Sequence, residues 1–598
     1  MAAFPNLFKS FSRTALLVVC VAFGFPKDAE AQASSPFRNI SPDVRYVGSK
    51  VCSGCHPKIF SSYIKTGMGG SMLPAGDVSL RDRLPAPATI FDKDNGQYIE
   101  VSRQQDDLYQ THYALDRDGK EIFRQTFKTA YVVGSGENGF GFLIRRDNYM
   151  FEAPLSYYTK SRRWSFSPGY EIHNYAFTRP VVEECIGCHS GRPQPVPGGL
   201  ALYGDPPFTE LAVGCENCHG PGEIHVRERQ TDHPPSGKID TSIVNPAHLN
   251  GWLADNICMK CHQGGDLRVE QPGKTGQDFR PGMPLDNAIA IFKVPLSHEA
   301  SEKPVLLEHY FSMTLSKCYR ASAGRLRCST CHDPHGRPSG QESVALYRSK
   351  CLRCHQPESC TLPGADRQSK SDDCAFCHMP KRTVTTITHA ALTDHTIAAR
   401  PGQPYPDEAF ESRAFGETGL LYLTAKPGES ASAIPDVTLL RAYLGVIHEG
   451  HEEFTRKKDE LLERLARRHP TNPAVLGAMA RRAAAENTQE GLRSGIRYLA
   501  EAVRAGSTAP EDFLLLGDLY GRDARHEEAI RVLEKGREAN PYFREFYEAV
   551  AVQEIELGKY GDALQTIRKG IDLFPDDTTL RRLEKKVQAA TIDDTTSK

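Results

Sequence analysis

The chain has 598 residues, which is long for one hydrophobic core and indicates roughly three or four domains. Its 73 Lys and Arg nearly balance its 75 Asp and Glu, so it has neither the basic field of a nucleic-acid binder nor the polyanionic bias of a disordered chain. Hydrophobic residues make up only 39% of the sequence, so large cofactors are expected to supply part of the core.

Residues 1–33 are predicted to be a secretory signal peptide. Lys9 and Arg13 precede an apolar run, and the sequence AEAQASS after it offers cleavage behind Ala31 or Ala33. The run is about a dozen residues long, whereas a membrane span needs ~20, and no later segment is apolar enough to cross a bilayer. We therefore expect export to the periplasm or another oxidising compartment, with no membrane span in the mature chain.

The segment 45–80, the first haem segment, contains the first of seven copies of the pattern Cys-x-x-Cys-His. Two thiols three positions apart reach the two vinyl groups of one haem, and the His that follows binds its iron. Structural zinc also uses Cys-x-x-Cys, but it needs no His directly after every second Cys, and a disulfide framework needs no fixed spacing. The sequence therefore predicts seven covalently attached haem c groups.

The residues of all seven motifs are assigned the same roles: two cysteines attach a haem, and the His is the proximal ligand of its iron. The attaching cysteines are Cys52, Cys55, Cys185, Cys188, Cys215, Cys218, Cys258, Cys261, Cys328, Cys331, Cys351, Cys354, Cys374 and Cys377. The proximal histidines are His56, His189, His219, His262, His332, His355 and His378.

The first haem has no His close behind its motif, so its sixth ligand is sought elsewhere. Met68 lies in KTGMGGSM, where a thioether bound to the iron would raise the potential of that haem. Met72 is a second candidate, and plain packing is the alternative for both residues. Because a long stretch without a haem motif follows, we expect this haem to lie apart from the other six.

Residues 81–180 are predicted to form a small β-rich module. The segments YIEVS, LYQTHYALD and EIFRQTF alternate partly between apolar and polar residues, and DNG and DRDG mark turns between them. A long disordered insertion is the alternative, against which the aromatic and β-branched content argues.

Residues 181–395 are predicted to be a loop-rich six-haem cytochrome domain. Many Pro and Gly residues leave space for only short helices and loops around the haems. His225 in CHGPGEIH, His335 in CHDPH, and His389 and His395 in THAALTDH are candidates for sixth ligands, because each lies near a haem motif. Each could instead bind a haem propionate or lie at the surface.

The other histidines near the haems divide into two groups. A ligand role stays open for His173, His248, His298 and His309, and none is expected for His112 and His233. Outside the motifs and the predicted signal peptide, which contains Cys20, two cysteines remain, Cys318 and Cys360, for which a disulfide is expected in an exported protein. A reactive or iron-binding thiolate is the alternative for these two cysteines.

Residues 396–436 are predicted to be a Pro- and Gly-rich linker, and residues 437–598 an all-α solenoid of tetratricopeptide-type repeats. The solenoid has helical periodicity and no Cys. A plain helical bundle is the alternative, but a 34-residue spacing relates Ala529 to Ala563, Gly536 to Gly570 and Pro541 to Pro575. Because repeat solenoids offer concave binding surfaces, we expect this one to dock a redox protein.

The haem region resembles multihaem cytochromes related to the tetrahaem electron acceptor of hydroxylamine oxidoreductase. It is more similar still to exported cytochromes that join such a module to C-terminal tetratricopeptide repeats. The resemblance implies covalent haem c, periplasmic location and electron transfer, and it supports the ligand roles of His225, His335, His389 and His395. It is carried by YVVGSG, FEAPLSYYT and SPGYE, and by CENCHGPGEIH, SKCYRASAGRLRCSTCHDPHG, CAFCHMPK and THAALTDH.

The sequence favours an electron-transfer protein, with helical repeats that dock its redox partner. The alternative is a multihaem oxidoreductase that acts on a small nitrogen or sulfur compound at one haem with an open distal side. No catalytic residue is designated, although the segment Cys318–Tyr319–Arg320 beside the fifth motif is where one would be sought. Nucleic acid is not an expected partner.

Overall fold

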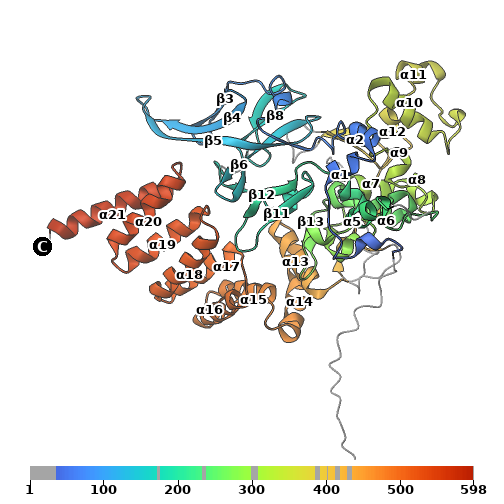
Figure 1. Cartoon of the computed structure of the whole chain (residues 1–598). Helices are drawn as coiled ribbons and strands as arrows, with labels where there is room; N and C mark the ends of the chain where they lie inside the picture. The colour runs from blue at the N-terminus through green and yellow to red at the C-terminus, as the bar shows by residue number, and fades with distance from the viewer. Residues whose placement is uncertain are drawn as a thin grey trace, which may run out of the picture. The chain divides into compact units, whose positions relative to one another are not determined.

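The computed structural model describes residues 35–170, 175–231, 237–297, 308–383, 391–400, 402–410, 418–426 and 434–596. The predicted signal peptide and the candidate ligands His173, His233, His298 and His389 lie outside the described residues. The chain is multidomain, with a β-rich region, a region of short helices and loops, and then stacked helical repeats (Figure 1). Among the described residues, no helix is both long and apolar enough to span a bilayer.

The first haem motif begins with Cys52 in the short helix α1 (Ser49–Ser53) and ends with His56, which directly precedes α2 (Pro57–Tyr63). Pro57 occupies the first turn of α2, where a missing N–H leaves no hydrogen bond unmade. The segment that follows does not stay separate from the β-rich region, because β1 (Met72–Pro74) pairs antiparallel with a strand of its sheet.

The β-rich region forms an antiparallel sheet in the order β10-β7-β6-β5-β4-β3-β2. The predicted DNG and DRDG turns join β2 to β3 and β4 to β5, and Gly96 and Gly119 there take φ values of 66° and 79°. Alternating residues face an apolar core that contains Val101, Leu108 and Phe142. The strands are β2 (Ala88–Asp92), β3 (Gln97–Gln104), β4 (Asp107–Leu115), β5 (Glu121–Val133), β6 (Gly139–Arg146), β7 (Tyr149–Glu152), β8 (Leu155–Tyr158), β9 (Arg163–Phe166) and β10 (Arg179–Pro180).

The region of the other six motifs contains short helices and small strand pairs, as expected for a loop-rich segment. Its helices are α3 (Glu183–Ile186), α4 (Glu216–His219), α5 (Glu223–Arg229), α6 (Gly251–His262), α7 (His309–Leu315), α8 (Lys317–Ala321), α9 (Cys328–Cys331), α10 (Gly340–Cys351), α11 (Gly364–Ser369) and α12 (Cys374–His378). Its strands are β11 (Arg192–Pro195), β12 (Tyr203–Glu210), β13 (Leu267–Glu270), β14 (Ile289–Lys293), β15 (Lys381–Thr383) and β16 (Ala391–Thr393).

The predicted linker is more than a spacer where the structure describes it. Its strand β17 (Leu421–Tyr422) pairs with β14, and Leu420 and Tyr422 lie in an apolar core together with residues of the first solenoid helix. The apolar residues among the Pro and Gly of this segment therefore extend the sheet and the core instead of facing water.

The C-terminal region is the expected stack of paired antiparallel helices. Ala529 and Ala563 are fully buried, and a Cβ on Gly536 would collide with the Phe546 ring, so the 34-residue spacing marks positions where helices approach closely. The helices are α13 (Asp436–His448), α14 (Thr455–Arg468), α15 (Pro473–Ala485), α16 (Gln489–Arg504), α17 (Pro510–Arg522), α18 (His526–Ala539), α19 (Arg544–Glu556), α20 (Tyr560–Leu573) and α21 (Thr578–Thr596).

Candidate haem sites

Most motifs form one turn of helix. In the first motif the His56 N–H donates to the Cys52 carbonyl over 2.9 Å, and in the third the His219 N–H donates to the Cys215 carbonyl over 3.0 Å. The fifth and sixth motifs repeat this bond. Because residues three apart share a face of a helix, the two thiols of each turn point to one side and the His follows at its end.

The cysteines of different motifs touch one another. Every cysteine of the described residues is a free thiol. A hydrogen bond between the Cys52 and Cys215 thiols raises the pKa of Cys52 and lowers that of Cys215 to about 6. The other thiol pairs that join two motifs are Cys188 with Cys261, Cys258 with Cys328, and Cys351 with Cys374.

Weaker electrostatic contacts complete a spatial order of the motifs. The pKa of Cys218 is raised chiefly by burial and further by Cys258, which links the third motif to the fourth. The pKa of Cys351 is likewise raised by burial and by Cys331, which links the sixth motif to the fifth. The motifs thus follow one another in the order one, three, four, five, six and seven, with the second beside the fourth.

The first motif is not set apart, which corrects the sequence-based expectation. Its thiol Cys52 contacts Cys215, and the Tyr63 hydroxyl donates to the Val213 carbonyl over 2.8 Å. The long β-rich insertion returns the chain to its starting point, so distance along the sequence did not predict distance in space.

Glu216, inside the third motif, helps to join it to the first, and the sequence analysis missed it. Its carboxylate is only 2% exposed and accepts the backbone N–H groups of Val47 at 2.9 Å, Gly48 at 2.7 Å and Gly222 at 2.7 Å. Burial raises the pKa of Glu216, while these three N–H groups act to lower it. An acidic residue between the paired cysteines of CENCH was the signal that could have found it.

Three predicted distal histidines lie opposite proximal ones. The ring centroids of His56 and His225 are 6.5 Å apart, those of His219 and His335 are 5.9 Å apart, and those of His332 and His395 are 6.2 Å apart. An imidazole nitrogen binds a first-row metal at about 2.0–2.1 Å, so two rings on one metal have centroids on the order of 6 Å apart. The structure therefore brings these residues together at spacings that fit an iron between them.

His309, which the sequence left open, joins this group. Its ring centroid lies 5.5 Å from that of the proximal His262 and 4.5 Å from that of His395. Burial lowers the pKa of His309 to about 3, helped by the neighbouring histidines, so it stays neutral as a metal ligand must. Its position at the start of α7, far along the chain from His262, gave no local signal.

The remaining candidates lie in other surroundings. Met72 is 1% exposed and packs in an apolar cluster with Leu143 and Tyr203, which is the packing alternative. Met68 is half-buried, and its backbone carbonyl accepts the Ser71 N–H at 3.1 Å. His112 lies inside the β-sheet and bonds Gln97 over 2.6 Å.

The expected disulfide between Cys318 and Cys360 is absent, because both residues are free thiols. Cys318 lies nearer to Cys354, whose charge adds to the effect of burial in raising its pKa, while Cys360 is exposed. In the same segment Arg320 forms an ion pair with Glu408 at 2.5 Å. This guanidinium is therefore engaged by an acidic neighbour.

The segment around the last three motifs has no apolar core of its own. From Lys317 to Arg382 no residue is buried, and Phe376 and Leu362 are 62% and 41% exposed. Folded segments of this length normally bury apolar side chains. Here the polypeptide does not supply the apolar surface against which such side chains would pack. Haems attached at these motifs would supply that surface, which is a second respect in which the residues fit this cofactor.

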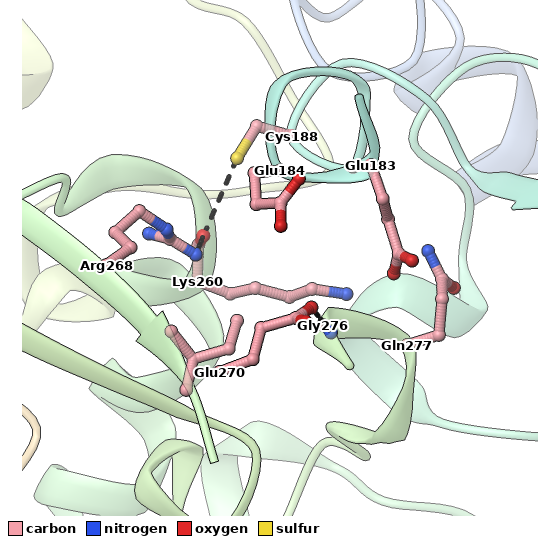
Figure 2. Close-up of a pocket in the computed structure, with 10 residues that line it drawn as sticks. Glu183, Glu184, Cys188, Lys260, Arg268, Glu270, Gly276 and Gln277 are labelled. Carbon is pink, nitrogen blue, oxygen red and sulfur yellow. Dashed lines mark hydrogen bonds between the residues drawn. The ribbon is translucent and has the colours of Figure 1, made fainter. Parts of the chain in front are cut away.

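A small pocket lies between the second and fourth motifs, beside Cys188 and Lys260 (Figure 2). The Lys260 side chain extends among Glu183, Gln277 and Glu270, and its carbonyl accepts the Cys188 thiol at 3.6 Å. Burial raises the pKa of Glu270 to about 7, with Glu184 and Glu183 adding to the effect, and burial lowers the pKa of Lys260.

One curated protein is similar to part of the chain. Over 221 residues the chain is 23% identical to the multiheme cytochrome MtrA of Shewanella baltica (strain OS185), a match that covers 36% of this chain and 57% of that protein. The chain thus spans little more than half the length of that relative. No protein-family model matches the chain. The chain is therefore distantly similar to a multihaem cytochrome over part of its length.

Solved structures with stacked helices are also similar to part of the chain. The tetratricopeptide domain of Arabidopsis OM64 is 14% identical, with a TM-score of 0.18 over 20% of this chain and 95% of that one. The tetratricopeptide protein YrrB is 15% identical, with a TM-score of 0.23 over 27% of this chain and 77% of that one.

Proposed function

We propose that this protein is an exported c-type cytochrome with seven covalently attached haems, which passes electrons between redox proteins. The thiol contacts between motifs support the proposal most directly, because haems attached to touching cysteines must themselves be neighbours. Each haem supplies a one-electron redox centre whose potential depends on its axial ligands and burial.

The protein's part is to attach, ligate and order these groups. The paired cysteines of each motif hold a haem, and the motif His is its proximal ligand. We assign His225 to the first iron, His335 to the third, His309 to the fourth and His395 to the fifth, because their rings face the proximal rings there. On this assignment His225, and not Met68, is the sixth ligand of the first iron, while His389 remains a candidate for another iron.

The finer resemblance is also part of the proposal. The motif segments are similar to relatives of the tetrahaem electron acceptor of hydroxylamine oxidoreductase, which favours low-potential, low-spin haems in the periplasm. The similarity to a multihaem cytochrome supports this assignment over part of the chain. The helical repeats are proposed to hold a redox partner.

Haem content and spin state test the proposal on the purified full-length protein. A pyridine haemochrome assay combined with intact mass should give seven haems per chain, and electron paramagnetic resonance should show chiefly low-spin ferric signals. His335→Ala should convert the third haem to a high-spin or newly ligated form, while His112→Ala, a histidine inside the β-sheet, should leave the spectrum unchanged. A haem count well below seven, or a spectrum insensitive to His335→Ala, would contradict the assignment.

A second candidate function is reduction or oxidation of a small nitrogen or sulfur compound. The pocket beside Cys188 favours it, because Lys260, Glu183 and Glu270 could hold and exchange protons there. A high-spin ferric signal that shifts on addition of nitrite or hydroxylamine would support this function. A spectrum that neither compound changes would leave electron transfer as the function.

A further inference from the structure

The segment around the last three motifs, residues 317–382, carries an unusual share of the positive charge and is called the basic lobe below. It holds twelve Lys and Arg against six Asp and Glu, although the whole chain has a formal charge of −2. The rest of the chain is therefore net negative. Its helices α10, α11 and α12 lie in one part of the molecule (Figure 1), where α10 contacts α12.

Much of this charge faces solvent. Some arginines of the lobe are engaged, as Arg348 is by Asp372 at 3.1 Å and Arg320 by Glu408. A second set is exposed and, among the described residues, has no carboxylate within ion-pair distance. This set consists of Lys317, Arg325, Arg353, Lys370 and Lys381.

The cations surround the haem motifs themselves. Lys350 and Arg353 lie near Cys331 of the fifth motif. The Lys370 ammonium lies 5.2 Å from the ring centre of Phe376, which stands between the two cysteines of the seventh motif. Positive charge and an exposed aromatic ring thus meet where the last haem would be attached.

Attached haems would lower the net positive charge of the basic lobe without removing it. Their propionates would offset part of the positive charge, while each ferric iron adds one positive charge to its porphyrin. Of the exposed cations, Arg353, Lys370 and Lys381 lie at the sixth and seventh motifs, at one end of the motif order, where electrons can enter or leave a chain of haems. A surface of one sign steers partners of the opposite sign and speeds their encounter.

We propose that the basic lobe is the docking surface for an acidic electron-transfer protein, an inference that rests on the proposed function. The partner presents carboxylates to the exposed Lys and Arg, and an apolar patch to Phe376. The helical repeats then hold the other of the two redox proteins between which electrons pass. Docking here places the partner against the sixth and seventh motifs, whereas docking on the solenoid does not depend on these cations.

The test uses the full-length, haem-loaded protein and a reduced flavodoxin of strongly negative charge as the electron donor. The lobe variant combines Arg353→Glu, Lys370→Glu and Lys381→Glu. The matched control makes the same change in charge on the solenoid with Lys535→Glu, Lys569→Glu and Lys585→Glu, three exposed lysines. Stopped-flow absorbance follows haem reduction at increasing concentrations of KCl.

At low salt we expect the lobe variant to be reduced at least ~10-fold more slowly than the wild type, and the control to change less than about 2-fold. The difference should shrink as salt screens the charges. An equal loss in both variants, or no loss in the lobe variant, would overturn the inference. Binding of the wild type to anionic phospholipid vesicles, lost in the lobe variant while the flavodoxin rate is unchanged, would assign the lobe to a membrane surface and also overturn it.

Haem content separates this inference from the proposed function. A wild type without seven haems contradicts the proposed function. A fully loaded protein whose rate of haem reduction is the same in the wild type and the lobe variant contradicts only the docking site. If the triple variant loads poorly, the single charge-removing variants Arg353→Gln and Lys381→Gln replace it. Each should then lower the low-salt rate about 2- to 5-fold.

Discussion

The basic lobe and the β-rich region differ in whether their own apolar side chains form a core. In the β-rich region Val101, Leu108 and Phe142 are completely buried, and the strands alternate so that one face is apolar. In the basic lobe no residue from Lys317 to Arg382 is buried. The difference indicates that the β-rich region folds on its own side chains, whereas the lobe depends on what is attached to its cysteines.

The solenoid resembles the β-rich region in this respect. Phe546 and Val550 are fully buried between neighbouring helices, and glycines allow the helices to approach. The lobe instead consists largely of motifs, turns and charged residues, and its Leu362 and Phe376 are exposed. Its stability should therefore follow haem attachment in the way that small metal-binding domains follow their metal.

Preventing haem attachment should give the largest effect. When the protein is produced without c-type haem maturation, we expect residues 317–382 to lose protection against proteases and amide exchange, by ~100-fold or more, because local opening then costs almost nothing. The strands β3, β4 and β5 and the helices α15–α20 should keep theirs. Hydrogen exchange with peptide-level mass spectrometry measures the amide protection of the lobe and of these strands and helices. A lobe that stays protected without haem would contradict the comparison.

Truncating one aromatic side chain in each region sharpens the contrast. Phe546→Ala should lower the free energy of unfolding of the solenoid by about 3–5 kcal/mol, because it leaves a cavity among buried side chains. Phe376→Ala, at 62% exposure, should cost less than about 1 kcal/mol. Urea unfolding followed by circular dichroism measures both variants. A large loss from Phe376→Ala in the haem-free protein would show a core in the lobe that the structure lacks.

Removing Glu216 probes where the haem-dependent part of the molecule begins. Glu216→Ala leaves three backbone N–H groups without their carboxylate acceptor, which should cost about 2–3 kcal/mol of local stability. The expected readout is faster amide exchange at Val47 and Gly48, together with a changed spectrum of the first haem. Glu538→Ala, an exposed solenoid carboxylate, is the control. Unchanged exchange would mean that the haems alone hold the first motif to the third.

The sequence predicted the local elements better than their arrangement. The strands of the β-rich region and the paired helices of the repeats follow from periodicity and turn residues, which act over a few positions. The contacts of Cys52 with Cys215 and of His309 with His262 and His395 join segments that are distant along the chain. No local pattern carries that information, because the β-rich insertion and the haem-lined loops decide which segments meet.

The absent disulfide has the same kind of cause. Cys318 and Cys360 flank the fifth and sixth motifs, and because the protein was expected to be exported, their pairing was the simplest prediction. The fold instead turns Cys318 toward Cys354 and leaves Cys360 exposed. A count of leftover cysteines cannot reveal which way a loop turns.

The smallest expected effect concerns the pH dependence of the solenoid, whose stability should be set by its own residues. Burial, together with the charge of Asp577, raises the pKa of Glu548 to about 7. A carboxyl whose pKa is raised in the folded state stabilises the fold below its unfolded value near 4.5, and this contribution is lost as the pH rises toward 7. Glu548→Gln keeps the carboxyl site neutral at every pH.

We therefore expect Glu548→Gln to match the wild type in thermal stability at pH 4 and to exceed it by a few degrees, roughly 2–4 °C, at pH 8. Differential scanning calorimetry across this range measures the gap, and Glu538→Gln, an exposed carboxylate on α18, should show none. Because the solenoid carries no haem motif, the gap should be the same with and without attached haem. A gap that appears only in the haem-loaded protein would mean that the stability of the solenoid also depends on the cofactor, against the contrast with the basic lobe.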